Sequence, residues 1–139
     1  MLDLNGTLAL DGQLLPVHSS LAQLGRSLDV TLLSADTHGT LEQVAMELGV
    51  RAVRLDENQG GAEQKAAYVE ALGAESVVAI GNGTNDAAML RSAALGIVVV
   101  GAEGCSLRAL TSADVVVASA ENALNLLLEP RRLVATLRS

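Results

Sequence analysis

The sequence is poor in aromatic residues and in cysteine. It contains no Phe and no Trp, and Tyr68 is its one aromatic residue. An interior without large rings must be built from Leu, Val, Ala and Ile, so we expect an aliphatic core. Cys105 is the one cysteine, which excludes an intramolecular disulfide. Nothing therefore points to an oxidising compartment, and a cytoplasmic location is expected.

Long apolar runs and a surplus of basic residues are also lacking. The longest apolar stretch, residues 93–102, is interrupted by Gly96 and is shorter than the roughly 18 residues that a membrane span needs. No signal-peptide pattern is visible, so no membrane association is expected. The net charge of −7 argues against a nucleic-acid partner, because binding to the phosphate backbone depends on clustered Lys and Arg.

The remaining pattern is typical of an α/β domain. With 139 residues, half of them apolar, the chain fits a single domain over residues 1–139. Apolar runs alternate with helical patterns, which is the rhythm of a parallel sheet with helices on both faces. The expected strands cover 30–33, 52–55, 77–80, 97–100 and 115–117, and the expected helices cover 19–28, 40–48, 62–72, 85–93 and 120–128.

Residues that can do chemistry follow the apolar runs. Asp3 follows the first run, Ser34 the second, and Gly81 begins a polar segment after another. Ligands of open α/β sheets bind at such carboxyl ends. Only Met1 and Leu2 precede Asp3, whereas a strand usually has about five residues, so the first strand is expected to be shortened or partly missing.

Four segments in chain order resemble the motifs of the haloacid-dehalogenase superfamily. They are Asp3 to Leu8 (Asp-Leu-Asn-Gly-Thr-Leu), Ser34, Lys65, and Gly81 to Asp86 (Gly-Asn-Gly-Thr-Asn-Asp). Within the superfamily the chain is most similar to small soluble proteins related to the phosphorylation domain of P-type ATPases. The resemblance implies a three-layer Rossmann-like fold with the mostly parallel sheet in the order 6-5-4-1-2-3 and helices on both faces.

The resemblance also implies an Mg²⁺-dependent phosphatase. Asp3 would attack phosphorus and form an aspartyl-phosphate, and Gly6 and Thr7 would form the turn that follows and help to bind phosphate. Ser34 and Ala35 would donate hydrogen bonds to the transferring phosphoryl group. On their own, Asp3 and Ser34 could equally be capping residues at the ends of strands.

Lys65 is the one lysine in a chain with eight arginines. A compact ammonium can neutralise both the nucleophile and the incoming phosphate, whereas an ordinary solvated lysine is the alternative. Asn85 is expected near the phosphate, or as a helix N-cap.

The metal ligands implied are the carboxylates of Asp3 and Asp86, the backbone carbonyl of Asn5, and Asn82. Oxygen ligands of this kind suit Mg²⁺. As an alternative without a metal, Asn82 and the glycine after it form a good turn dipeptide.

Two asparagines depart from the superfamily pattern. Related phosphatases usually carry an aspartate at the position of Asn5, and the loss of general acid–base catalysis costs about 10² to 10⁴ in rate. Asn82 removes one negative charge from the metal site. We therefore expect a slow phosphatase, and the rival interpretation is a pseudoenzyme that serves as a phosphate-binding regulatory or scaffold module. Both asparagines precede glycine, so conversion to aspartate through a succinimide is a further hypothesis.

No segment is long enough to form a cap over the site. Residues 8–15 predict a bare β-hairpin with Asp11 and Gly12 at its tip, and residues 56–60 join a strand directly to a helix. An open site suggests a phosphorylated small molecule or a phosphoprotein as substrate, or a second subunit that closes the pocket in a homo-oligomer. A phosphoacceptor domain of the receiver type is less consistent with the order of the motifs, because here the acceptor comes first.

Overall fold

The computed structural model describes all residues from 1 to 139 and contains a six-stranded parallel sheet. Its strands lie in the order β5-β4-β1-β6-β7-β8, and a separate antiparallel hairpin joins β2 to β3. The strands are β1 (Leu2–Asp3), β2 (Ala9–Leu10), β3 (Gln13–Leu14), β4 (Thr31–Ser34), β5 (Arg51–Arg54), β6 (Val78–Gly81), β7 (Leu95–Val99) and β8 (Val115–Val117). When the sheet strands alone are counted along the chain, this is the order 3-2-1-4-5-6. The predicted order is therefore confirmed.

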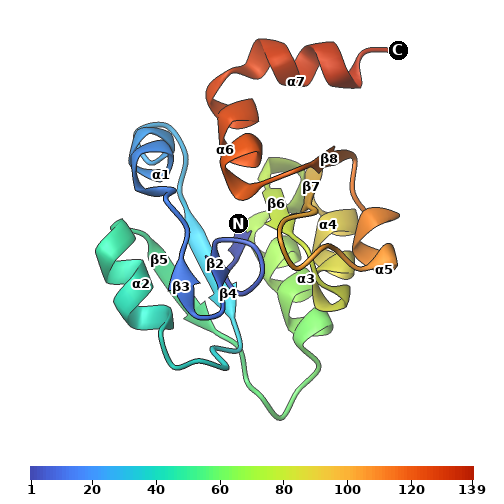
Figure 1. Cartoon of the computed structure of the whole chain (residues 1–139). Coiled ribbons are helices and arrows are strands. Elements are labelled where there is room, and N and C mark those ends of the chain that lie inside the picture. The colour runs from blue at the N-terminus through green and yellow to red at the C-terminus, as the bar shows by residue number, and fades with distance from the viewer.

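Helices cover both faces of the sheet (Figure 1). They are α1 (His18–Leu24), α2 (Leu41–Leu48), α3 (Gly61–Leu72), α4 (Ala87–Ser92), α5 (Leu107–Leu110), α6 (Ala120–Leu128) and α7 (Pro130–Leu137), with the short 3-10 helices η1 (Ala74–Ser76) and η2 (Thr84–Asp86). None of them combines the length and the apolar character that crossing a membrane would require.

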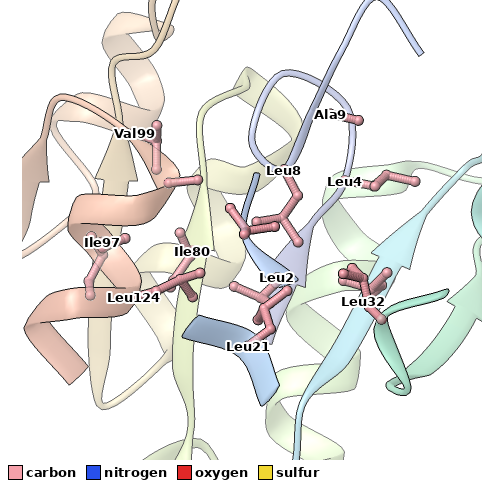
Figure 2. Packing of buried hydrophobic residues seen from close by; sticks show 14 of the residues in the cluster. Leu2, Leu4, Leu8, Ala9, Leu21, Leu32, Ile80, Ile97, Val99 and Leu124 are labelled. Carbon is pink, nitrogen blue, oxygen red and sulfur yellow. The ribbon is translucent and has the colours of Figure 1, made fainter. Parts of the chain in front are cut away.

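Most of the buried apolar residues form two clusters, one on each face of the sheet, and only Leu33 and Leu55 belong to neither. The larger has 21 residues and lies under α1, α2 and α6. In Figure 2, Leu2 and Ile80 from neighbouring strands lie beside Leu21 of α1 and Leu124 of α6. The smaller cluster has 7 residues and lies under α3, α4 and α5. Adjacent β7 residues enter different clusters, Ile97 the larger and Val98 the smaller, because successive side chains of a strand point to opposite faces.

The hairpin has the short form that the sequence predicts. Ala9 pairs with Leu14 and Leu10 with Gln13, so the loop contains only Asp11 and Gly12. Both have positive φ angles, 51° and 76°, which is the conformation of a two-residue turn that matches the twist of a hairpin. No cap interrupts the chain here or between β5 and α3.

Several boundaries differ from the prediction. Helix α1 ends at Leu24 rather than at residue 28, because Gly25 follows as its C-cap. Helices α5 and α7 were not predicted. Helix α7 has no buried residue and leads away from the sheet toward the C-terminus (Figure 1). Pro130 in its first turn and its amphipathic pattern are helix signals that the sequence does carry.

Candidate functional site

The expected site residues meet at the carboxyl edge of three adjacent strands. Strand β1 lies between β4 and β6, and Asp3 at its end pairs in register with Leu33 of β4. Ser34 and Gly81 end the two flanking strands. Parallel strands place their carboxyl ends at one edge of the sheet, so the segments after them face one another.

Lys65 links two carboxylates that are distant in sequence. It lies in α3, one helical turn before Val69, and both side chains are buried against the sheet. Its Nζ lies 2.6 Å from Oδ1 of Asp3 and 2.6 Å from Oδ1 of Asp86. The Lys65 residue is 1% exposed. A lysine so deeply buried needs paired charges, and two carboxylates supply them.

The second oxygen of Asp86 fixes the loop that follows β6. Oδ2 accepts the backbone N–H groups of Asn82 and Gly83 at 2.9 and 2.8 Å. A Cβ atom at Gly81 would lie 2.5 Å from Cγ of Asp86. Glycine at position 81 therefore lets the carboxylate fold back against the strand end.

The three buried charges leave a net charge of −1 at the site. Desolvation by burial and the Asp86 carboxylate raise the pKa of Asp3 from 3.8 to about 7. Burial alone would lower the pKa of Lys65, but Asp3 and Asp86 outweigh burial and raise it. Lys65 is therefore held as an ammonium, while Asp3 has a strong affinity for a proton or another cation.

The turn after Asp3 is closely packed against the loop after β6. Gly6 has a φ angle of +79°, and a Cβ atom there would lie 2.6 Å from Nδ2 of Asn82 and 2.6 Å from Oε2 of Glu103. Oγ1 of Thr7 lies 3.3 Å from Oδ2 of Asp3 and 3.3 Å from Oδ1 of Asn82. Its single proton can serve one of the two oxygens at a time.

Glu103 is a residue that the sequence prediction missed. It lies in the loop between β7 and α5, at the same edge of the sheet, and its side chain makes no hydrogen bond or ion pair. Nothing in its spacing marks it. The one usable signal is that it follows the carboxyl end of a buried strand, where ligand-binding residues collect.

Backbone donors remain free between β1 and β4. Neither Asn5 nor Ala35 donates its N–H within the chain. Oγ of Ser34 accepts the N–H of Asp36 at 2.9 Å, and Nδ2 of Asn5 lies 3.4 Å from the same oxygen. Two free amides beside a hydroxyl form an arrangement that can bind an anionic oxygen.

Asp36 and Asn85 lie near the site residues in the sequence, but their contacts differ from those of the site residues. Oδ1 of Asp36 accepts the N–H groups of Thr40 and Leu41 at 2.7 and 2.8 Å at the start of α2, and its Oδ2 pairs with Arg54 at 2.6 Å. Asp36 therefore stabilises the helix start. Asn85 is exposed, its side chain makes no hydrogen bond, and it is not the N-cap of α4, which begins at Ala87 after Asp86.

The geometry disfavours the conversion of the two asparagines. Succinimide formation requires attack by the next backbone nitrogen. Gly6 donates its N–H to the carbonyl of Ala9 at 2.7 Å, and Gly83 donates its N–H to Asp86 at 2.8 Å. Both nitrogens are thus held in hydrogen bonds, and we expect Asn5 and Asn82 to persist.

The oxygen atoms at this edge fit a hard divalent cation rather than a soft one. No group of three or more His, Cys, Asp or Glu side chains is placed to hold a metal, so a site of the zinc type is not formed. The donors present are the carboxylates of Asp3 and Asp86, which carry a surplus negative charge, and the amide oxygen of Asn82, which lies near Asp3 through Thr7. Mg²⁺ is bound through one or two carboxylates and retains waters, and this donor set suits it.

Comparisons with solved structures give the fold. A 3-deoxy-D-manno-octulosonate 8-phosphate phosphatase from Moraxella catarrhalis, solved with magnesium, phosphate and its sugar, has a TM-score of 0.73 at 18% identity, over 99% of this chain and 91% of that chain. The cobalt-bound phosphatase of the same name from Haemophilus influenzae has a TM-score of 0.72 at 14% identity, over 98% and 86% of the two chains. The catalytic domain of the CPx-ATPase CopB-B has a TM-score of 0.68 at 24% identity, over 82% of this chain and 45% of that chain.

Sequence comparison finds a relative of unassigned activity. No protein-family model matches the chain. An uncharacterized protein of Methanocaldococcus jannaschii is 40% identical over 92 residues, which cover 62% of this chain and 99% of the relative. The chain therefore belongs to the same family as this archaeal protein, and its fold is that of the capless haloacid-dehalogenase phosphatases, as the four motifs predict.

Proposed function

We propose that the protein is an Mg²⁺-dependent phosphohydrolase that acts through an aspartyl-phosphate on Asp3. The observation that carries the proposal is the buried contact of Lys65 with both Asp3 and Asp86, each at 2.6 Å. A capping aspartate or a surface lysine needs no such arrangement. The structural likeness to magnesium-bound and cobalt-bound phosphatases supports the same reaction class.

Each residue has a role that its position allows. An Asp3 oxygen attacks phosphorus and the leaving-group oxygen departs. Lys65 offsets the charge of Asp3 and of the phosphoryl oxygens. Ser34 and the free N–H of Ala35 donate hydrogen bonds to those oxygens as negative charge accumulates on them. Water then attacks the phosphoryl group, releases phosphate and restores the Asp3 carboxylate.

The metal would be held by Asp3, Asp86, the carbonyl oxygen of Asn5 and Asn82. When bound, Mg²⁺ would supply charge neutralisation for the phosphoryl group. Asn82 also donates through Nδ2 to the carbonyl of Gly104 at 3.4 Å, a contact that an aspartate could not make. We propose that Asn82 fastens the loop at the expense of metal affinity.

Asn5 limits the rate in this proposal. Its amide is too weak an acid to protonate the leaving group and too weak a base to take a proton from water. Asn5 lies against Ser34 at 3.4 Å, where an acid in the same place would reach the phosphoryl group. The expected result is slow breakdown of the aspartyl-phosphate rather than failure to form it.

The substrate is proposed to be a phosphorylated small molecule. The two structurally similar phosphatases act on a sugar phosphate, and the hairpin, whose loop has only two residues, is too short to form a cap domain. A phosphoprotein or a neighbouring subunit of a homo-oligomer is also compatible with an open site. A screen of phosphorylated metabolites would identify which class of phosphorylated compound the protein hydrolyses.

The test is release of phosphate from p-nitrophenyl phosphate and labelling by acetyl phosphate, each with Mg²⁺ and with Asp3→Asn as the control. We expect both to depend on Asp3 and on Mg²⁺. Absence of Asp3-dependent release and labelling would favour the alternative, a pseudoenzyme that binds phosphate without turning it over.

A further inference from the structure

A pocket lies where α3, η2, α4 and α5 meet. Its volume is about 370 Å³. No acidic residue lines it, and most of its wall consists of alanines and hydroxyl side chains. The polar lining residues are Arg91, Arg108, Thr84, Thr111 and Ser112.

The two arginines of this pocket are not neutralised. Nη2 of Arg91 donates to Oγ of Ser112 at 2.9 Å, and the Arg108 guanidinium makes no hydrogen bond or ion pair within the chain. Neither has a carboxylate within 4.0 Å. By contrast, Arg54 pairs with two acidic residues. Like charges that face one pocket repel each other, and a bound anion would remove that repulsion.

The pocket adjoins the proposed catalytic site from outside. Thr84 lies in η2, two residues before the catalytic-loop residue Asp86. Ala62, also in the wall, lies in the first turn of α3, the helix that carries Lys65. The pocket therefore lies beside both the loop and the helix that contribute to the proposed catalytic site.

We propose that the pocket formed by Arg91 and Arg108 binds an anionic group, a phosphate or a carboxylate. Guanidinium groups bind such groups through paired hydrogen bonds, and the hydroxyl of Thr84, which makes no hydrogen bond within the chain, adds a further donor. The anion comes either from the distal end of the substrate or from a separate molecule. Only the first source rests on the phosphatase activity proposed above.

Direct binding is tested by titrating the full chain with inorganic phosphate and following the arginine Nε–Hε signals by NMR. We expect the signals of Arg91 and Arg108 to shift and saturate, while that of Arg26, an exposed arginine outside the pocket, does not. The same titration in the Asp3→Asn protein should give the same shifts, because the pocket is separate from the nucleophile.

The Arg108→Gln variant should raise the phosphate dissociation constant reported by Arg91 about tenfold or more, since one charged donor is lost. Arg26→Gln is the matched control and should leave it unchanged. Arg108 has no partner in the fold, so this variant is expected to fold normally. Shifts that fail to saturate, or that are equal for Arg26, overturn the proposal.

The two sources are separated with alkanediol phosphates of increasing length, as monophosphates and as bisphosphates. One outcome is that kcat/KM is about tenfold higher for a bisphosphate of one length than for the others. If Arg108→Gln loses this preference but keeps p-nitrophenyl phosphate turnover, the pocket binds the distal end of the substrate. If the NMR signals of Arg91 and Arg108 shift and saturate with phosphate but kcat/KM shows no preference for chain length, the pocket binds a separate anion. If no Asp3-dependent hydrolysis exists, the phosphatase proposal fails, and the NMR titration still decides the pocket.

Discussion

Replacing the proposed nucleophile is expected to stabilise the metal-free protein at pH 8. Two buried carboxylates share the ammonium of Lys65, so one negative charge is left in a desolvated place. The Asp3→Asn substitution removes that charge and leaves the Lys65–Asp86 pair at 2.6 Å intact. Functional sites often contain unfavourable arrangements of this kind, and replacing the residue responsible then stabilises the protein.

The size of the effect follows from the pKa of Asp3. Its rise from 3.8 to about 7 corresponds to about 4 kcal/mol in the free energy of unfolding well above pH 7. That rise already includes the attraction of Lys65 for the carboxylate. Replacing Asp3 by a neutral side chain is therefore expected to gain up to about 4 kcal/mol, or about 12 °C in Tm for a chain of this size.

The dependence on pH has a definite sign. Between about pH 4 and 7 the folded state keeps the Asp3 proton that the unfolded state releases, because the folded pKa is the higher one. The unfolded state therefore binds fewer protons, and the free energy of unfolding falls as the pH rises through this window. The difference between Asp3→Asn and the natural protein should grow from pH 4 to pH 8.

The assay is thermal unfolding followed by circular dichroism in EDTA at four pH values from 5 to 8. Asp86→Asn is the contrast, because Oδ2 of Asp86 accepts two backbone N–H groups and its loss should lower Tm at every pH. If Asp3→Asn lowers Tm at pH 8 as Asp86→Asn does, the account of a surplus buried charge is wrong.

Three further predictions concern the same site. Asn5→Asp should speed turnover at least about tenfold by supplying proton transfer, and an unchanged kcat in steady-state phosphate release would mean that another step limits. Lys65→Met should lower the free energy of unfolding by about 3–5 kcal/mol at pH 8, since two buried carboxylates lose their partner; urea denaturation measures this, and added Mg²⁺ should restore part of the loss. Gly6→Ala should lower the free energy of unfolding by about 1–3 kcal/mol, because Gly6 has a φ angle of +79° and a Cβ atom there would approach Asn82 and Glu103. Gly39 also has a positive φ angle, but a Cβ atom there would have no neighbour within 4 Å. Gly39→Ala should therefore lower the free energy of unfolding by less in the same urea experiment.

The sheet was predictable because its strands are short aliphatic runs between helices. The run at 115–117 coincides with β8, and the helix at 120–128 coincides with α6. The strand order came from the resemblance, not from periodicity. The start of α4 was placed two residues early, because Asp86 takes up the N–H groups of Asn82 and Gly83, and sequence alone does not reveal that tertiary hydrogen bonding.

The site was predictable to the extent that singular residues mark it. Lys65 stood out as the one lysine, and the structure brings it to Asp3 and Asp86. Glu103 and the pocket of Arg91 and Arg108 did not stand out, because an exposed charged residue in a loop or helix has no distinctive spacing. Their proximity to the site arises only from the packing of α4, α5 and the loop before α5.

The unequal division of the apolar clusters has a consequence for motion. The layer that carries Lys65 rests on 7 buried apolar residues, whereas the opposite layer rests on 21. Segments with less buried apolar contact open more readily. Amide hydrogens of α3 and α4 should therefore exchange with solvent deuterium sooner than those of α2 and α6, and occupancy of the site by a cation should slow that exchange by tying α3 to the end of β1.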